Sequence, residues 1–168
     1  MEISYVLDAS AFINGFKLTT NNNFTVSEIT TEIKDFESKL SFDMALEEGK
    51  ITILDVSQNY INKVEETISN SGDILRLSNP DKKLISLACM LKESGKNVLV
   101  ISDDYTIQNT LKIMNINYSG VITEGIKEIY NWMNVCEGCK KQYSSDYPFD
   151  DCEICGSKIY KKRIKVNK

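Results

Sequence analysis

The sequence predicts an α/β domain with a central parallel sheet flanked by helices, followed by a small C-terminal zinc ribbon. Three observations support this prediction. Short apolar runs alternate with segments of helical periodicity over residues 1–116, and this alternation is typical of parallel sheets with helical crossovers. Two CxxC pairs follow, Cys136/Cys139 and Cys152/Cys155. The length of 168 residues suits one ordinary domain and a small appendage.

The first elements are a strand, a helical turn and a loop. Residues Ile3–Leu7 form an apolar run that predicts a buried strand, and Asp8 follows it directly. A short helical turn is expected after Asp8, and Gly15 should end it. Residues 17–23 are mostly polar and predict an exposed loop.

A single long helix is then expected over residues 27–48. Apolar residues recur at helical spacing through this segment, so they should form one buried face. Gly49 is in a position to end the helix. The residues of the expected buried face are Ile29, Ile33, Phe36, Leu40 and Met44.

Strands and helices alternate over the rest of the domain. Strands are predicted at residues 51–56 and 98–101, where apolar residues run together. Helices are predicted at residues 58–70 and from Asn79 onwards, where Pro80 suits the first helical turn. A last helix should begin directly after the second of these strands. The alternation indicates crossovers between parallel strands.

This order predicts three parts of the chain: a domain at residues 1–116, a connector at residues 117–135, and the cysteine module with a basic tail at residues 136–168. The pattern does not distinguish strand from helix for residues 126–135. Charge is segregated in a similar way, because the net charge of −4 divides into −7 over residues 1–135 and +3 over residues 136–168. A nucleic-acid partner is therefore compatible with the acidic total.

The composition excludes several functional classes. The chain contains no histidine, so hydrolytic chemistry would have to use carboxylates and metal ions rather than a histidine base. No run of about 20 apolar residues could span a bilayer, and the N-terminus lacks the features of a signal peptide. Four of the five cysteines cluster, which predicts metal binding in a reducing, cytoplasmic setting. Cys89 is expected to be a buried, inert thiol.

Acidic residues stand where the predicted elements could bring them together. Asp8 follows the first strand, and Asp103 and Asp104 follow the strand at residues 98–101. Ligands of open α/β sheets bind outside these carboxyl ends. Asp81 lies in the first turn of its helix, and Glu32 could join from another helix. Such a cluster would suit Mg²⁺ or Mn²⁺. Helix capping is the alternative explanation for the aspartates, and Glu32 alone is also typical of a solvated helix residue.

The cysteine module is the strongest single signal in the chain. Its two CxxC pairs are separated by twelve residues, a spacing that lets four thiolates meet at one tetrahedral ion. One structural Zn²⁺ is the expected occupant, because Cys136, Cys139, Cys152 and Cys155 leave no coordination position open for catalysis. Rubredoxin-like iron and disulfide pairing are the alternatives.

The segment after the last cysteine is basic and contains no acid. Basic side chains bind phosphate and aromatic side chains stack on unpaired bases, so contact with RNA is a reasonable hypothesis, with a merely solvated tail as its alternative. Tyr147 and Tyr160 are further aromatics of this part. The residues predicted to contact RNA are Lys140, Lys141, Tyr143, Lys158, Lys161, Lys162, Arg163 and Lys165.

Four motifs in order resemble those of PIN-domain nucleases. They are YVLDASAFI at Tyr5–Ile13, Glu32 within TTEIKD, Asp81 within SNPDKKLISLA, and VISDDYTIQN at Val100–Asn109. The resemblance covers most of residues 1–115 and implies a PIN-like fold. It also implies a shared catalytic Mg²⁺ or Mn²⁺ site, with Ser10 as a hydroxyl that steadies the first aspartate. The implied catalytic and metal-binding residues are Asp8, Glu32, Asp81 and Asp104, with Asp103 as a neighbouring candidate ligand.

In motif order, spacing and total length the chain is similar to archaeal members of the NIN-one-binding protein family, which are ribosome-maturation endonucleases. This similarity implies cleavage of precursor small-subunit ribosomal RNA near its mature 3′ end, on an assembling small ribosomal subunit. The products would carry a 3′-hydroxyl and a 5′-phosphate. No membrane and no small-molecule cofactor are expected. Two alternatives stay open: a non-catalytic RNA- or ribosome-binding assembly factor, and a toxin-like PIN ribonuclease.

Overall fold

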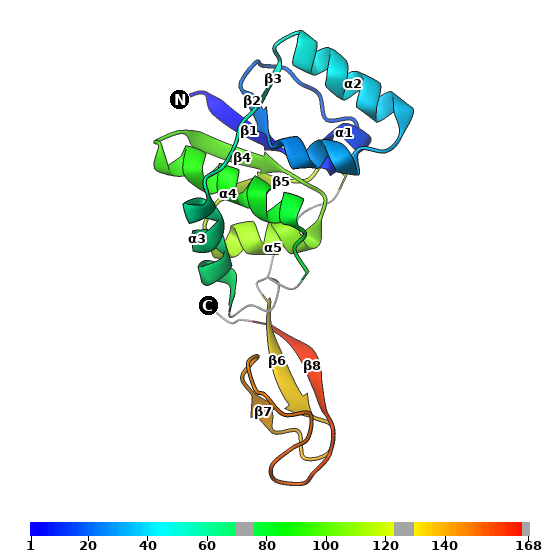
Figure 1. The fold of residues 1–168 in the computed structure, drawn as a ribbon, viewed down its shortest axis with the longest axis vertical. Helices are drawn as coiled ribbons and strands as arrows, with labels where there is room; N and C mark the ends of the chain where they lie inside the picture. Colours follow the sequence, from blue (N-terminus) through cyan, green and yellow to red (C-terminus); the bar gives the residue numbers. More distant parts are fainter. Residues whose placement is uncertain (70–75, 123–129, 166–168) are drawn as a thin grey trace.

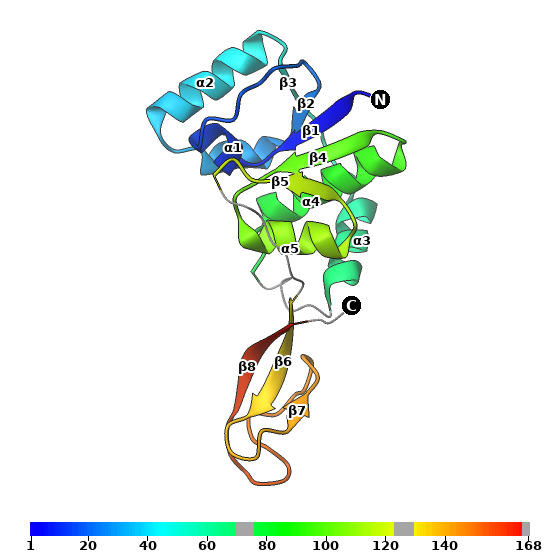
Figure 2. The same ribbon diagram turned by 180° about the vertical axis from the view of Figure 1, so that it is seen from behind.

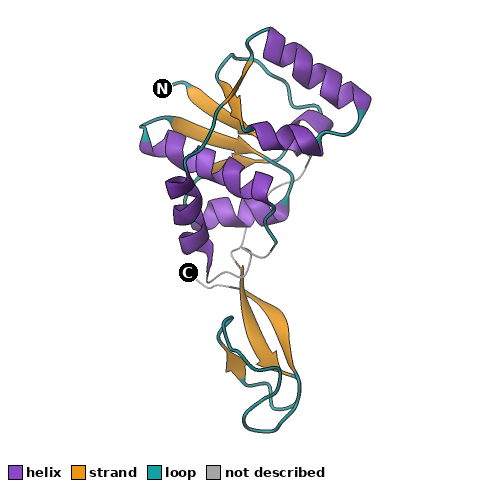
Figure 3. Ribbon diagram, viewed as in Figure 1, coloured by secondary structure: helices purple, strands orange, loops and turns teal. Residues whose placement is uncertain are grey.

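A five-stranded parallel sheet forms the centre of the larger part of the chain, and a three-stranded antiparallel sheet forms the smaller part (Figure 1). The computed structural model of the chain describes residues 1–69, 76–122 and 130–165. Figure 3 shows helices gathered around the larger sheet, whereas the described residues of the smaller part contain strands and loops without a helix. The α/β fold with a central parallel sheet is confirmed.

The larger sheet has the strand order β3-β2-β1-β4-β5. All its neighbouring strands are parallel, and Figure 2 shows β5 beside β4 from behind. The strand order reverses between β1 and β4, and a crevice opens outside the carboxyl ends of strands at such a point. The strands are β1 (Ile3–Leu7), β2 (Asn23–Thr25), β3 (Ile51–Ile53), β4 (Asn97–Ile101) and β5 (Asn117–Ser119).

Helices surround this sheet. The helix α4 packs against β1 and β4, while α3 packs against α4. The start of α4 follows the prediction, because Pro80 lies in its first turn and the residues Ser78 and Asp81 form a capping box. The helical elements are α1 (Ala9–Ile13), the 3₁₀ helix η1 (Ser27–Glu32), α2 (Phe36–Glu47), α3 (Gln58–Ile68), α4 (Asn79–Glu93) and α5 (Tyr105–Ile113).

The long helix predicted over residues 27–48 is wrong, because the chain forms η1 and α2 with a break between them. Ile33 has an extended backbone, with φ −85° and ψ 97°. Asp35 then caps a new helix, since its side chain accepts a hydrogen bond from the Ser38 backbone N–H at 2.8 Å. The aspartate thus satisfies a donor that a continuous helix would have bonded internally.

The break also makes the predicted apolar face of this segment wrong in its second half. Ile29 and Ile33 are buried as expected, but Phe36, Leu40 and Met44 are 78%, 47% and 52% exposed. The new helix instead buries a different set of side chains, Ser38, Phe42 and Ala45. A helical period read across a break assigns the wrong face to everything after it.

We expect stability measurements to show which face of α2 is buried. Phe42 is 3% exposed and packs edge-on against Phe12 at a ring-centroid distance of 5.0 Å. Replacing Phe42 by Ala should therefore lower the free energy of unfolding by about 3–5 kcal/mol. Replacing the exposed Phe36 by Ala should change it by about 0.5 kcal/mol or less. Urea unfolding of both variants checks this, and a larger loss for Phe36→Ala would favour the continuous helix instead.

Smaller differences from the prediction concern loops and strand ends. Asn23, expected in an exposed loop, lies in β2 and is 1% exposed. Asn22 beside it donates hydrogen bonds to the carbonyl of Ile3 and to Oγ of Ser4, at 2.9 and 3.0 Å. Polar side chains here replace missing backbone partners at the amino ends of β1 and β2, and composition alone does not reveal this use.

The predicted connector, residues 117–135, contains parts of both sheets. The strand β5 pairs with β4 in the larger sheet, and β6 (Tyr130–Cys136) pairs in the smaller one. Residues 130–135 are therefore strand, while residues 126–129 of the undecided segment lie outside the described residues. The domain limits at residues 116 and 136 stay a prediction.

The smaller sheet has the order β7-β6-β8, with β7 at Gln142–Tyr143 and β8 at Ile159–Lys165. Both pairings are antiparallel. A cation–π contact joins the two parts of the chain, since the guanidinium of Arg76 lies 3.7 Å from the ring centroid of Trp132. Among the described helices, none combines the length and apolar character that crossing a membrane requires.

Candidate functional site

Three carboxylates from distant parts of the chain meet at the carboxyl edge of the larger sheet. Asp8 follows β1, Glu32 ends η1, and Asp81 lies in the first turn of α4. One ligand oxygen from each of them lies within 4.8 Å of those of the other two. The strand-order reversal between β1 and β4 places this cluster where open α/β sheets bind ligands.

Two serine hydroxyls hold the first of these carboxylates. Asp8 is 4% exposed, and its Oδ2 accepts hydrogen bonds from Ser10 at 3.0 Å and from Ser102 at 2.8 Å. The strands β1 and β4 run in register up to Leu7 and Ile101, so Asp8 and Ser102 become neighbours. Among the described residues, Oδ1 of Asp8 has no hydrogen-bond partner although it is buried.

Ser102 is a residue that the sequence reasoning missed. It could have been found from its position directly after an apolar strand, because that position also made the two following aspartates candidates. The hydroxyl of Ser102 also accepts from the backbone N–H of Asp104 at 3.1 Å, and that of Ser10 accepts from the N–H of Asp103 at 3.0 Å. These bonds orient the Asp8 carboxylate and leave Oδ1 free for another ligand.

Burial has the largest effect on the pKa values of the three clustered acids. It raises the pKa of Asp8, against the hydrogen bonds from Ser102 and Ser10, which lower it. It also raises the pKa of Glu32, where the charges of Asp81 and Asp8 add to the rise. The pKa of Asp81 is raised by burial as well, opposed by its hydrogen bonds with Ser78. Burial therefore opposes the ionisation of all three acids, and a nearby positive charge would favour it.

Asp81 combines the two roles that the sequence left open. Its Oδ2 accepts from the backbone N–H of Ser78 at 3.1 Å, and the Ser78 hydroxyl accepts from the Asp81 N–H at 3.3 Å. The same hydroxyl makes a long contact of 3.5 Å with Oε1 of Glu32. Helix capping therefore uses one oxygen of Asp81 and fixes its carboxylate beside the cluster rather than competing with ligand binding.

Asp104 and Asp103 stand outside the group of three. Oδ1 of Asp104 caps α5 by accepting from the N–H groups of Thr106 and Ile107 at 2.7 and 3.2 Å. The charge of Asp104 nevertheless raises the pKa of Asp8, so it adds to the negative potential of the site. Asp104 therefore suits the role of a further ligand at the edge of the cluster.

Asp103 has a structural position. Its Oδ2 accepts from Asn14 Nδ2 at 2.7 Å, and its Oδ1 accepts from the N–H groups of Val121 and Ile122 at 2.8 and 3.1 Å. Both oxygens thus join the segment after β5 to the end of α1. We leave Asp103 out of the proposed metal site for this reason.

The donor set fits a hard divalent cation. It consists of carboxylate oxygens, one of which is buried without a partner among the described residues. Oxygen ligands of this kind suit Mg²⁺ and Mn²⁺. A cation there would relieve the mutual repulsion of the acids and satisfy the free oxygen of Asp8.

The raised pKa values predict a pH dependence of the metal-free chain. These acids bind protons more tightly in the folded than in the unfolded state. The protonated acids therefore contribute their full stability below their ordinary pKa values of about 4. This contribution is lost as the pH rises through their raised pKa values in the folded chain. In chelator, we expect the thermal midpoint of the wild-type chain to fall over this pH range relative to the midpoint of Asp8→Asn. Mn²⁺ should restore the wild-type midpoint at neutral pH. Parallel midpoints of the two chains at every pH would contradict this.

The four clustered cysteines also meet. The Sγ atoms of Cys136, Cys139, Cys152 and Cys155 all lie within 4.8 Å of one another. Those of Cys136 and Cys155 are 3.3 Å apart, and those of Cys139 and Cys152 are 3.6 Å apart. A tetrahedral zinc ion with Zn–S bonds of about 2.3 Å holds its sulfurs about 3.8 Å apart, so the four sulfurs fit that ion. The fifth cysteine, Cys89, is buried in α4, as expected.

The basic residues of the smaller part occupy different surroundings. A shallow pocket of ≈ 410 Å³ is lined by Glu137, Lys140, Lys158 and Tyr160. Tyr160 is 41% exposed, so its ring is accessible to a ligand.

Several other candidates for RNA contact lie on β8 or form ion pairs. Lys161, Lys162 and Arg163 are exposed on β8, whereas the side chain of Lys165 lies outside the described residues. Lys141 pairs with Glu153, and Lys158 pairs with Asp151.

Tyr143 differs from the other predicted RNA-contact residues because it is only 7% exposed. Its hydroxyl lies 3.0 Å from Sγ of Cys152, and its ring stacks on that of Tyr147 at a centroid distance of 4.0 Å. A ring enclosed in this way cannot stack on a base, so Tyr143 is left out of the proposed RNA-binding surface.

Known proteins resemble this chain over most of its length. The family profile described as the PIN domain of ribonuclease matches residues 5–91. The chain is 50% identical to "Endoribonuclease Nob1" of Methanothermobacter thermautotrophicus, over 94% of this chain and 92% of that protein. It is 39% identical to "Endoribonuclease Nob1" of Methanocaldococcus jannaschii, over 95% of this chain and 78% of that protein. It is also 30% identical to "Ribonuclease VapC1" of Thermoplasma acidophilum, over 95% and 79%.

Proposed function

The chain belongs to the archaeal Nob1 endoribonuclease family of PIN-domain proteins, and from that membership we propose that it is a metal-dependent endoribonuclease. Its proposed substrate is precursor small-subunit ribosomal RNA, cut near the mature 3′ end on an assembling small subunit. The products would carry a 3′-hydroxyl and a 5′-phosphate. This substrate follows from the family resemblance, whereas the chemistry follows from the acidic site.

One observation carries the proposal of metal-dependent hydrolysis. Ligand oxygens of Asp8, Glu32 and Asp81 lie within 4.8 Å of one another although these residues are far apart in the chain. Helix capping explains one oxygen of Asp81. It explains neither Glu32 nor the buried Oδ1 of Asp8, which has no partner within the described part of the chain. A cluster that is costly without a cation is best explained by a function that uses one.

Each acid of the site then has a role in the proposed reaction. Asp8, Glu32 and Asp81 hold Mg²⁺ or Mn²⁺, and Asp104 flanks them as a further ligand or as a charge. A divalent cation held by these residues would supply positive charge for the scissile phosphate and would lower the pKa of an attacking water. A carboxylate of the cluster would accept a proton from the attacking water, the bond between phosphorus and O3′ would break, and the leaving O3′ would take up a proton from solvent. Histidine cannot act as the base because the chain has none.

RNA binding is assigned to the smaller part, because the acidic site repels phosphate. We propose that residues 1–116 act as the nuclease unit, that residues 117–135 connect it, and that residues 136–168 form a zinc ribbon with a basic tail. Lys140, Lys158 and Tyr160 surround a pocket that suits a phosphate and a stacked base. The exposed basic residues of β8, Lys161, Lys162 and Arg163, extend this surface, and Lys165 stays a candidate from the sequence alone.

The test is cleavage of an RNA fragment that spans the 3′ end of precursor small-subunit ribosomal RNA. We expect Mn²⁺ to support a single cut with a 3′-hydroxyl on one product and a 5′-phosphate on the other, and a chelator to abolish it. Binding without any cut under these conditions would favour a non-catalytic assembly factor. Equal cutting of unrelated single-stranded RNA would favour a toxin-like ribonuclease, so an unrelated fragment of equal length is the control.

A further inference from the structure

We propose that Tyr143 is a positioning residue of the four-cysteine site, holding the Cys152 ligand in place through a hydrogen bond to its sulfur. This inference rests on the proposed zinc site and extends it beyond the four ligands. The sequence offered Tyr143 as an RNA contact, and its burial gives it this different use instead.

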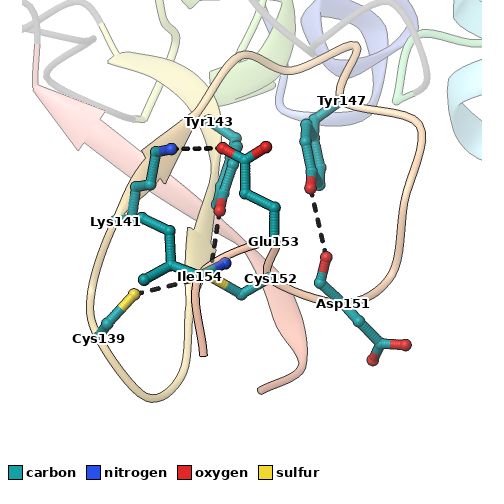
Figure 4. A network of polar contacts seen from close by, with 8 residues as sticks. All are labelled: Cys139, Lys141, Tyr143, Tyr147, Asp151, Cys152, Glu153 and Ile154. Atoms are coloured by element: carbon teal, nitrogen blue, oxygen red, sulfur yellow. Dashed lines mark hydrogen bonds and ion pairs between the residues drawn. The ribbon is translucent and has the colours of Figure 1, made fainter. Parts of the chain in front are cut away.

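The geometry of the bond is well defined (Figure 4). The Tyr143 hydroxyl lies 3.0 Å from Sγ of Cys152, a residue that is itself 3% exposed. The same sulfur accepts from the backbone N–H of Ile154 at 3.4 Å. A cysteine that binds a metal does so as a thiolate and has no proton to give. The tyrosine must therefore be the donor when the site is loaded.

Neighbouring contacts hold the tyrosine in this orientation. Its ring stacks on Tyr147, and the amine of Lys141 lies 5.0 Å from its ring centroid. That amine also pairs with Glu153 (Figure 4), which lies between Cys152 and Cys155. Lys141 follows the first CxxC pair, so these contacts join the two cysteine turns. In the folded module they hold the phenol at the sulfur.

The bond should affect the metal in two ways. A donor at the sulfur draws electron density away from it, which lowers the energy of its lone pairs and makes it less reactive. The bond also fixes the rotamer of Cys152, so the thiolate is held in the orientation in which it binds the metal. Outer contacts of this kind typically change metal affinity by about 10- to 100-fold when removed.

Tyr147 provides a matched control. Its hydroxyl donates to the backbone carbonyl of Asp151 at 3.3 Å, while its ring packs in the same cluster as Tyr143. Replacing either tyrosine by Phe removes one hydroxyl and keeps the ring. The two variants therefore differ in whether the lost hydroxyl touches a sulfur.

The experiment measures Co²⁺ and Zn²⁺ binding to the full chain and to Tyr143→Phe and Tyr147→Phe. In Tyr143→Phe we expect the sulfur-to-cobalt charge-transfer absorption to move to longer wavelength, because the sulfur lone pairs rise in energy. We also expect its Zn²⁺ affinity, measured by chelator competition, to fall by about 10- to 100-fold. Tyr147→Phe should keep the wild-type spectrum and stay within about twofold of its affinity.

Distinct outcomes would overturn the inference and the site beneath it. An unshifted spectrum and unchanged affinity in Tyr143→Phe, or equal changes in both variants, would show that Tyr143 is ordinary packing while the metal site stands. A wild-type chain without any charge-transfer band would overturn the four-cysteine metal site itself, and the role of Tyr143 with it. Far-ultraviolet circular dichroism establishes that each variant is folded.

Discussion

Replacing Asp8 by Asn is expected to lower the rate of RNA cleavage by about 10²- to 10³-fold, with little change in RNA affinity. Asn keeps the size of the side chain but removes the charge at the centre of the acidic cluster. Asp8 carries the buried oxygen that has no partner among the described residues, so its loss should weaken the metal more than it weakens RNA binding. Single-turnover cleavage in Mn²⁺ and a separate binding titration without added Mg²⁺ or Mn²⁺ measure the two effects.

The same variant should not lose stability when metal is absent. The Asn carbonyl can accept from Ser10 and Ser102 as Oδ2 of Asp8 does. Its amide would then take the place of Oδ1 and carry no negative charge near Glu32 and Asp81. Removing a buried charge from beside two acids favours the folded state. We therefore expect an unchanged or higher thermal midpoint in chelator, which distinguishes lost chemistry from lost structure.

A surface aspartate supplies the matched control. Asp43→Asn makes the same chemical change on the exposed side of α2, and it should leave the cleavage rate within about twofold of the wild type. If Asp8→Asn cut RNA as fast as Asp43→Asn does, the acidic cluster would be a structural feature rather than the site of hydrolysis. An assembly factor without catalysis would then be the better description.

Replacing Cys152 by Ser is the second change with a large expected effect: it should unfold the smaller sheet. The buried apolar cluster of this part consists of Cys136, Tyr143 and Cys152, with Tyr147 and Ile159 packed against it. Two of its three buried members are thus proposed metal ligands. Such a small core cannot hold a fold by itself, and a structural zinc ion typically contributes about 10–16 kcal/mol of binding free energy.

We expect Cys152→Ser to lose bound zinc and the dispersed amide resonances of β6, β7 and β8, while those of the larger sheet persist. RNA affinity should fall by at least about tenfold, because the basic residues of β8 lose their common scaffold. Cys89→Ala, which removes the thiol outside the cluster, should retain zinc and RNA binding. A Cys152→Ser chain with an intact, zinc-free ribbon would show that the sheet is stable without metal.

Local patterns predicted the parts of this protein that local physics controls. The strand at Ile3–Leu7 was predictable because it is a short, buried apolar run, and its bounds agree with the structure. The helix beginning at Asn79 was predictable because a proline favours the first helical turn, and the capping box seen in the structure acts within that same turn. The meeting of the four cysteines was predictable because each CxxC turn is self-contained.

Predictions failed where two local preferences competed. The apolar period over residues 27–48 favoured one helix, but Asp35 caps a second helix and the chain breaks before it. Tyr143 reads as an exposed aromatic in a basic segment, yet the cysteine turns enclose it. In both cases the outcome depends on packing between elements, which a linear pattern does not contain.

By itself, the sequence determined which chemistry was available to this protein: carboxylates without histidine, and thiolates at metal-binding spacing. Only the tertiary structure decided which acids share a site, because strand order and register bring Asp8 beside Ser102 and close to Glu32 and Asp81. It also turned both oxygens of Asp103 towards backbone and side-chain donors. The physical reason is range: capping and metal-turn geometry act within a few residues, whereas the approach of distant carboxylates depends on how the whole sheet is assembled.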